Sequence, residues 1–275
     1  MFELWTVSSE FILLTALLLV FWRLYLQRQR FEREKAEFEQ RYSDLNDAGL
    51  RLLELKEALE LEQKKSARLL RNILPERVIR DLQEKGESTP ERFGNVSILF
   101  ADIVNFTGIV SSMDPDELIV ELNDIFGAFD MIFAAHNCER IKTVGDSYMA
   151  VGGMFRQDGG HCRDLVLAAI EARDYLAKRN QQPGVRRWQM RFGVHCGSVV
   201  GGIVGRERYI YDIFGDTVNT ASRIEHASEA MKINVSSDVY NKLRDEFDFT
   251  LRGMVEVKGK GALEMFFVNG VKEES

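Results

Sequence analysis

Proline, cysteine and histidine are scarce in this chain, whose 275 residues include four, three and four of them. So few prolines leave no long proline-rich linker. The cysteines, Cys138, Cys162 and Cys196, are odd in number and lack metal-ligand spacing, which favours a reduced, cytosolic compartment. An excess of basic charge is also missing: the net charge is −7, which argues against a nucleic-acid partner. The composition is that of a folded protein with one or two domains.

A long hydrophobic run is missing as well, because the apolar stretch over 11–22 is shorter than the about 20 residues of a bilayer span. Extended to 4–26 it reaches that length, with Glu10 and Arg23 near its edges. Basic residues follow the stretch, so a transmembrane helix over 4–26 is predicted, in a single-pass protein of the inner cell membrane with its C-terminal part in the cytoplasm. A cleaved signal peptide or a peripheral segment is the alternative.

The segment 27–70 contains no proline and is rich in charge. Apolar residues recur every seven positions at Leu24, Phe31, Phe38, Leu45, Leu52 and Leu59. A second apolar seam, which a strong coiled coil needs, is poor. The pattern predicts a parallel coiled-coil signalling helix of marginal stability, and the alternative is a solvated charged helix with a narrow apolar edge.

The segment 71–92 breaks this helix at Pro75 and continues into a short amphipathic helix. From residue 93 to 270, apolar strands alternate with helices, which predicts an α+β domain with helices packed on an essentially antiparallel, ferredoxin-like sheet. The strands are expected at 95–103, 138–144, 147–153, 187–195, 198–204, 208–213, 232–236 and 254–268, the last with an internal turn. The helices are expected at 114–135, 161–180, 216–228 and 237–245.

Two aspartates each follow an apolar strand, Asp102 within 98–107 and Asp146 within 141–150. A buried carboxylate is costly without compensation. Two carboxylates brought together repel each other unless a cation lies between them, and hard oxygen ligands favour Mg²⁺ or Mn²⁺. A pair of such metals is suited to phosphoryl chemistry on a nucleotide. The alternative is a simple turn aspartate at each place.

Five ordered blocks resemble the catalytic domain of class III nucleotidyl cyclases over about 93–270, and within that family the adenylate cyclase branch of bacterial-type, membrane-anchored homodimers. The blocks are FADIVNFT at 100–107, KTVGDSYM at 142–149, RFGVHCG at 191–197, YDIFGDTVNTASR at 211–223 and VKGKG at 257–261. The segment 71–92 is similar to the transducer that precedes many of these domains.

The resemblance implies a metal and phosphate site. Two Mg²⁺ or Mn²⁺ ions would be held by Asp102, Asp146 and the carbonyl of Ile103. The residues implied to bind the β- and γ-phosphates are Phe106, Thr107, Gly108, Arg191 and Lys258. For Arg191 a surface ion pair is the alternative, and for Lys258 the neighbouring Lys260 is an equal candidate.

The resemblance also implies the remaining roles. Asn219 would position the ribose, and Arg223, one helical turn later, would stabilise charge on the α-phosphate. Lys142 and Asp212 would select the base: an acid accepts a hydrogen bond from the adenine amine and repels guanine O6, so ATP is the expected substrate.

The expected protein is therefore a homodimeric adenylate cyclase with two shared active sites, converting ATP to cyclic AMP and pyrophosphate. Its dimer geometry would be set through the coiled coil. Because few residues precede 4–26, its input is expected from a membrane sensor partner or the lipid bilayer, or there is no input. The alternatives are a guanylate cyclase, a catalytically silent nucleotide-binding module and a structural coiled-coil membrane protein.

Overall fold

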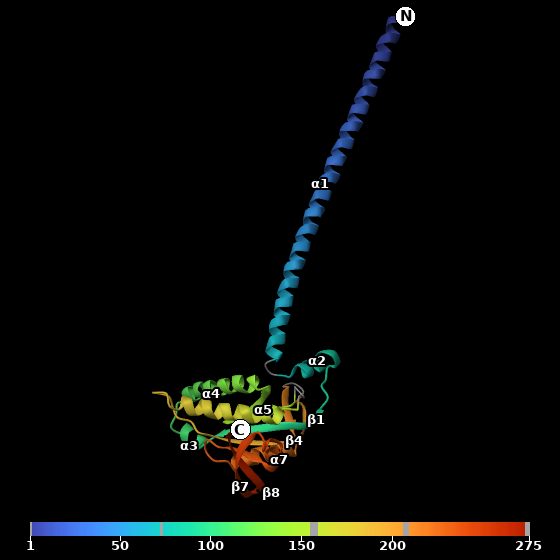
Figure 1. Ribbon diagram of the computed structural model, residues 1–275. Coiled ribbons are helices and arrows are strands. Elements are labelled where there is room, and N and C mark those ends of the chain that lie inside the picture. Colours follow the sequence, from blue (N-terminus) through green and yellow to red (C-terminus); the bar gives the residue numbers. More distant parts are fainter. Residues whose placement is uncertain (1, 72–73, 155–158, 206–208, 273–275) are drawn as a thin grey trace. The chain divides into compact units, whose positions relative to one another are not determined.

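The computed structural model describes residues 2–71, 74–154, 159–205 and 209–272, the side chains of the helix only from residue 14. The chain divides into two compact units, Met1–Asn72 and Ile73–Ser275. The first unit is one helix, α1 (Phe2–Arg71) (Figure 1). It contains no proline and a single glycine, and side-chain pairs one turn apart such as Lys35–Glu39 support its charged surface.

The prediction of a transmembrane helix over 4–26, and with it of an inner-membrane location, is wrong. No helix in the described part of the chain is long and apolar enough to cross a membrane. The physical reason lies in the sequence: the apolar stretch over 11–22 is too short, and lengthening it draws in Glu10 and Arg23.

The second unit is an α+β domain, as predicted, built on one sheet (Figure 1). In the described residues the sheet has the strand order β2-β3-β1-β4-β6-β8-β7, and β5 pairs with β4. Its strands are β1 (Glu91–Ile103), β2 (Cys138–Val144), β3 (Ser147–Gly152), β4 (Met190–Val204), β5 (Ile210–Phe214), β6 (Ile233–Ser236), β7 (Phe247–Val257) and β8 (Gly261–Val271). The helices are α2 (Glu76–Lys85), α3 (Phe106–Val110), α4 (Pro115–Ala135), α5 (His161–Arg179), α6 (Asp216–His226) and α7 (Ser237–Leu243).

The pairings are antiparallel except that β4 runs parallel to β6, so the essentially antiparallel sheet is confirmed. Several element boundaries differ from the prediction by a few residues, and two differences are larger. The expected strands at 187–195 and 198–204 form the single strand β4, because Cys196 and Gly197 stay paired with β1. The terminal hairpin begins earlier, at Phe247, and its turn lies between Val257 and Gly261 as expected.

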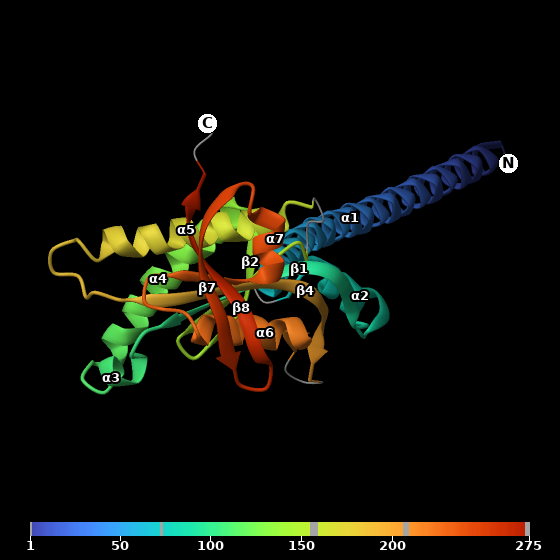
Figure 2. The same cartoon turned by 60° about the horizontal axis from the view of Figure 1, so that its bottom comes forward.

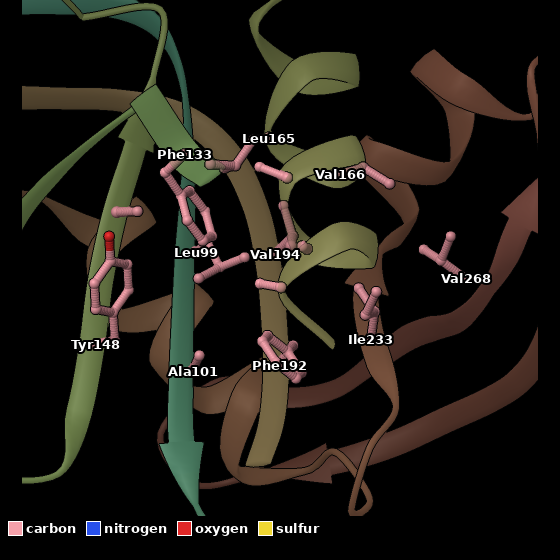
Figure 3. Packing of buried hydrophobic residues seen from close by; sticks show 14 of the residues in the cluster. Leu99, Ala101, Phe133, Tyr148, Leu165, Val166, Phe192, Val194, Ile233 and Val268 are labelled. Carbon is pink, nitrogen blue, oxygen red and sulfur yellow. The ribbon is translucent and has the colours of Figure 1, made fainter. Parts of the chain in front are cut away.

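The central strand β1 is buried on both faces because the sheet is covered on both sides. Figure 2 shows α4 and α5 on one side of the sheet and α6 on the other. Leu99 and Ala101 pack with Tyr148 and with α4 and α5 in the larger core, part of which Figure 3 shows. Ile98 and Phe100 belong instead to the cluster that includes Ala221 of α6. Alternate residues of β1 thus enter two different cores. The strand is therefore packed on both faces up to its C-terminal end.

Candidate active site

The end of β1 brings together residues that lie far apart in the sequence. Asp102 stands opposite Arg191 of β4 in the strand register, and Nη2 of Arg191 lies 2.7 Å from Oδ2 of Asp102. Asp146 follows Gly145 in the β2–β3 turn, where a φ of 63° suits glycine. Burial raises the pKa of the Asp146 carboxyl, and hydrogen bonding to the backbone of Asp146 itself and of Ile103 opposes this rise.

Asp102 and Asp146 are close enough to repel each other. Burial raises the pKa of the Asp146 carboxyl, and the negative charge of Asp102 raises it further. A divalent cation between the two would remove this repulsion, so the pair fits the Mg²⁺ or Mn²⁺ ions that the resemblance implies. The described residues contain no group of three or more His, Cys, Asp or Glu side chains placed to hold a metal. Such a site would therefore use two carboxylates, with oxygens of the backbone and of the nucleotide completing the shell.

The segment after β1 begins the helix α3, which is five residues long and contains Phe106, Thr107 and Gly108. Asn105 precedes it with a φ of 58°. A Cβ at Gly108 would lie 2.7 Å from Oδ1 of Asn105, so only glycine lets this side chain fold over the helix. Binding of phosphate by these three residues stays a prediction.

The two predicted base-selecting residues are paired. Lys142 of β2 donates to Asp212 of β5, with Nζ 2.5 Å from Oδ2. The other carboxylate oxygen of Asp212 accepts from the backbone N–H of Ile213 at 2.8 Å. The Asp212 side chain is largely buried, and the Lys142 side chain is half-buried. The ion pair therefore presents a fixed donor and a fixed acceptor at one edge of the sheet.

The remaining predicted residues lie on or beside α6. Asn219 is exposed and Arg223 is half-buried, one turn further along the helix. Lys260 forms an ion pair with Asp216 at the start of α6, whereas Lys258 is exposed on the β7–β8 turn. Lys258 is thus the better placed of the two lysines to reach a ligand.

The predicted residues form two separate groups within one chain. In the described residues no hydrogen bond or ion pair connects Lys142, Asp212 or Arg223 with Asp102 or Asp146. The structure brings Asp102, Asp146 and Arg191 together, and it pairs Lys142 with Asp212. It does not bring the two groups into contact.

Glu225 was missed by the sequence analysis although it contacts Arg191 and its pKa is affected by the charge of Asp102. It lies on α6, is 1% exposed, and places Oε1 3.1 Å from Nε of Arg191. Burial raises its pKa to about 8; the charge of Asp102 adds to this rise, and Arg191 opposes it. The signal in the sequence is an acid at a position that continues the buried face of α6 after Ala221.

The comparisons with known proteins identify the family. The family model for the adenylate and guanylate cyclase catalytic domain matches residues 88–270, so the chain belongs to this family. An adenylate cyclase of Mycobacterium tuberculosis is 37% identical over 78% of this chain and 48% of its own length. Human retinal guanylyl cyclase 2 is 35% identical over 85% of this chain and 21% of its own. The chain thus spans half or less of these relatives.

Solved structures of cyclase domains are also similar to this chain. The guanylate cyclase domain of RhGC from Catenaria anguillulae, in complex with GTP, is 29% identical, with a TM-score of 0.64 over 66% of this chain and 100% of that domain. The adenylyl cyclase CyaB from P. aeruginosa is 26% identical, with the same TM-score over 68% of this chain and 100% of that structure. The second unit therefore has the cyclase fold, and the chain carries a nucleotide cyclase catalytic domain. Relatives with either base preference are equally similar.

The pKa of Glu225 predicts how stability depends on pH. Its carboxyl is protonated in the fold up to about pH 8 and in the unfolded chain only up to about pH 4.5, so the folded state holds the extra proton between these values. The stability of the wild type should therefore fall, relative to that of Glu225→Gln, as pH rises from 5 to 8. The expected change is a few kcal/mol, because each tenfold change in acidity corresponds to about 1.4 kcal/mol.

Urea unfolding of both proteins with a metal chelator, followed by near-ultraviolet circular dichroism, measures this difference. Comparing the two variants cancels the contribution of every other titrating group. A constant difference across the pH range would show that Glu225 is ionised in the fold.

Proposed function

We propose that this chain is a homodimeric adenylate cyclase that converts ATP to cyclic AMP and pyrophosphate. The observation that carries the choice of ATP is the Lys142–Asp212 pair, because the comparisons do not favour either base. Asp212 accepts a hydrogen bond from the exocyclic amine of adenine, and Lys142 donates to the ring nitrogen beside it. Guanine would place its O6 against the carboxylate and would be repelled. A guanylate cyclase is the alternative.

The reaction assigned to the site is attack of the ribose 3′-oxygen on the α-phosphorus. The new O–P bond forms as the bond to the bridging oxygen of the β-phosphate breaks; pyrophosphate leaves, and the hydroxyl proton passes to solvent. Asp102, Asp146 and the Ile103 carbonyl would hold two Mg²⁺ or Mn²⁺ ions, which lower the pKa of the hydroxyl and neutralise phosphate charge.

The side chains of this chain bind and orient the nucleotide. Arg191, Lys258 and the α3 segment at 106–108 hold the β- and γ-phosphates. Asn219 orients the ribose. Arg223 is placed to balance the charge that develops on the α-phosphate.

The two separate groups of residues support a site shared between two chains. One chain supplies the metal aspartates and Arg191, and its partner supplies Lys142, Asp212, Asn219 and Arg223. A symmetric dimer then has two equal sites. The proposal includes pairing of the α1 helices through the seven-residue seam, because Phe31, Phe38, Leu45, Leu52 and Leu59 are all exposed in the single chain.

Replacement of Asp102 tests the metal site. Asp102→Ala should lower cyclic nucleotide formation at least about a hundredfold, because the electrostatic stabilisation that metal ions supply is worth several kcal/mol. Asp174→Ala, on the exposed surface of α5, is the matched control and should leave the rate unchanged. The assay is chromatographic measurement of product with Mg²⁺ or Mn²⁺. Substantial turnover by a folded Asp102→Ala protein would mean that the metal site is misassigned.

The base preference is tested by changing both base-selecting residues. The wild type should form cyclic AMP from ATP with little cyclic GMP from GTP. Lys142→Glu combined with Asp212→Cys should lower the ratio of the two kcat/KM values at least about tenfold, because the adenine amine loses its acceptor. The assay is competition of ATP and GTP in one reaction. Preference for GTP by the wild type would establish the guanylate alternative.

The role of α1 is tested by replacing apolar residues of its seven-residue seam with charged ones. Leu45→Glu with Leu52→Glu should weaken dimerisation more than about tenfold, because buried leucines contribute about 1.5–3 kcal/mol each, and activity at low protein concentration should fall in parallel. Leu50→Glu with Leu61→Glu, away from the seam, is the matched control. Sedimentation velocity and product formation at several protein concentrations give both quantities. Equal dimerisation and equal activity in the two double variants would exclude the seam as the contact between α1 helices.

A further inference from the structure

Arg191 lies between two carboxylates, and only one of them is at the metal site. Its Nη2 atom is 2.7 Å from Asp102, and its Nε atom is 3.1 Å from Glu225. The contact with Glu225 is close but lacks a well-aligned hydrogen bond: the Nε atom and both carboxyl oxygens are buried and have no hydrogen-bond partner in the described residues. Buried polar groups in this state need an explanation.

The position of Glu225 is fixed by backbone packing. Its main chain lies against Gly193 of β4, where an added Cβ would stand 2.2 Å from the Glu225 nitrogen. The preceding residue, Ile224, is held by Asn234, whose Nδ2 donates to the Ile224 carbonyl at 2.8 Å. The main chain that carries the Glu225 carboxyl group is therefore fixed, beside the longer side chain of Arg191. Nδ1 of the exposed His226 lies 2.8 Å from Oε2 of Glu225.

A purely structural role explains this arrangement poorly. Burying a carboxyl group whose two oxygens lack hydrogen-bond partners is costly, whether the group is ionised or protonated. An apolar side chain of similar size would avoid that cost. What the carboxyl group supplies is a second acceptor for the guanidinium, on the side away from Asp102.

We propose that Glu225 is a positioning residue that holds Nε of Arg191 while the Nη groups turn from Asp102 to the triphosphate. In the free protein, Asp102 competes for the guanidinium and prevents full alignment with Glu225. When cations occupy the Asp102 site, that competition ends, the Nε hydrogen bond to Glu225 becomes aligned, and two Nη groups face the phosphates. A carboxyl oxygen accepts from Nε whether Glu225 is ionised or protonated. The inference rests on the role of Arg191 in the proposed function.

The test measures binding of inorganic tripolyphosphate to the full chain in the presence of Mg²⁺, by titration calorimetry. Glu225→Leu should weaken binding at least about tenfold, because a hydrogen bond to a charged group is lost. Glu225→Gln retains an acceptor for Nε and should stay within about threefold of the wild type. Glu229→Gln, whose side chain is 63% exposed and lies 3.8 Å from Arg252, is the matched control and should bind like the wild type.

A double-mutant cycle separates positioning from a general loss of structure. Glu225→Leu should have no further effect on tripolyphosphate binding in an Arg191→Ala background, because the residue through which it acts is absent. A loss of equal size in both backgrounds would overturn the inference. If Glu225→Leu does not fold, Glu225→Asp, which withdraws the carboxyl group, should weaken binding severalfold. Wild-type affinity in a folded Glu225→Asp or Glu225→Leu protein would also overturn it.

The calorimetric result is independent of turnover, so two failures are distinguishable. Altered tripolyphosphate binding without any cyclic product from the wild type would remove the proposed reaction and keep the role of Glu225. Cyclic product from the wild type with KM for ATP unchanged in Glu225→Leu would keep the reaction and remove the role of Glu225. Absence of tripolyphosphate binding by the wild type would overturn the inference, since Arg191 would then not be a phosphate residue.

Discussion

The repulsion between Asp102 and Asp146 is the constraint on which the site depends. One carboxylate ends a strand and the other stands in a hairpin turn, and burial makes their proximity costly. Arg191 relieves part of that repulsion from the neighbouring strand. The remaining negative charge favours binding of a positive charge at this end of the sheet. Divalent cations would supply such charge, so the repulsion that is unfavourable without them would favour their binding.

The rest of the domain keeps these groups in place against their repulsion. β1 has β3 on one side and β4 on the other, and its side chains alternate between two cores. Its last residues cannot separate from Arg191 without breaking the pairing with β4. The turn that carries Asp146 is attached through β3 to the same strand. Both acids are thus held by strands that are adjacent in the sheet.

Much of the fold was readable from the sequence because its signals are local. Apolar runs gave the strands, and Asp114 before Pro115 marked the start of α4, where its side chain accepts from the backbone N–H of Asp116. Asp102 and Asp146 were predicted as metal ligands because an acid after an apolar strand is unusual, and the structure brings them close enough to repel each other. Glu225 was not found, because its meaning depends on Gly193 and Arg191, which are distant in sequence. The membrane prediction failed because hydrophobicity was extended past charged residues to reach the required length.

In the proposed dimer, α6 would serve both active sites. Its buried side carries Glu225, which contacts Arg191 of the same chain. The exposed Asn219 and half-buried Arg223 lie earlier on the same helix and would act in the site formed with the other chain. Because the main chain of Glu225 is packed against Gly193 of β4, this helix of eleven residues is fixed on the sheet. The packing that positions Glu225 beside Arg191 for one site would therefore also position Arg223 for the other.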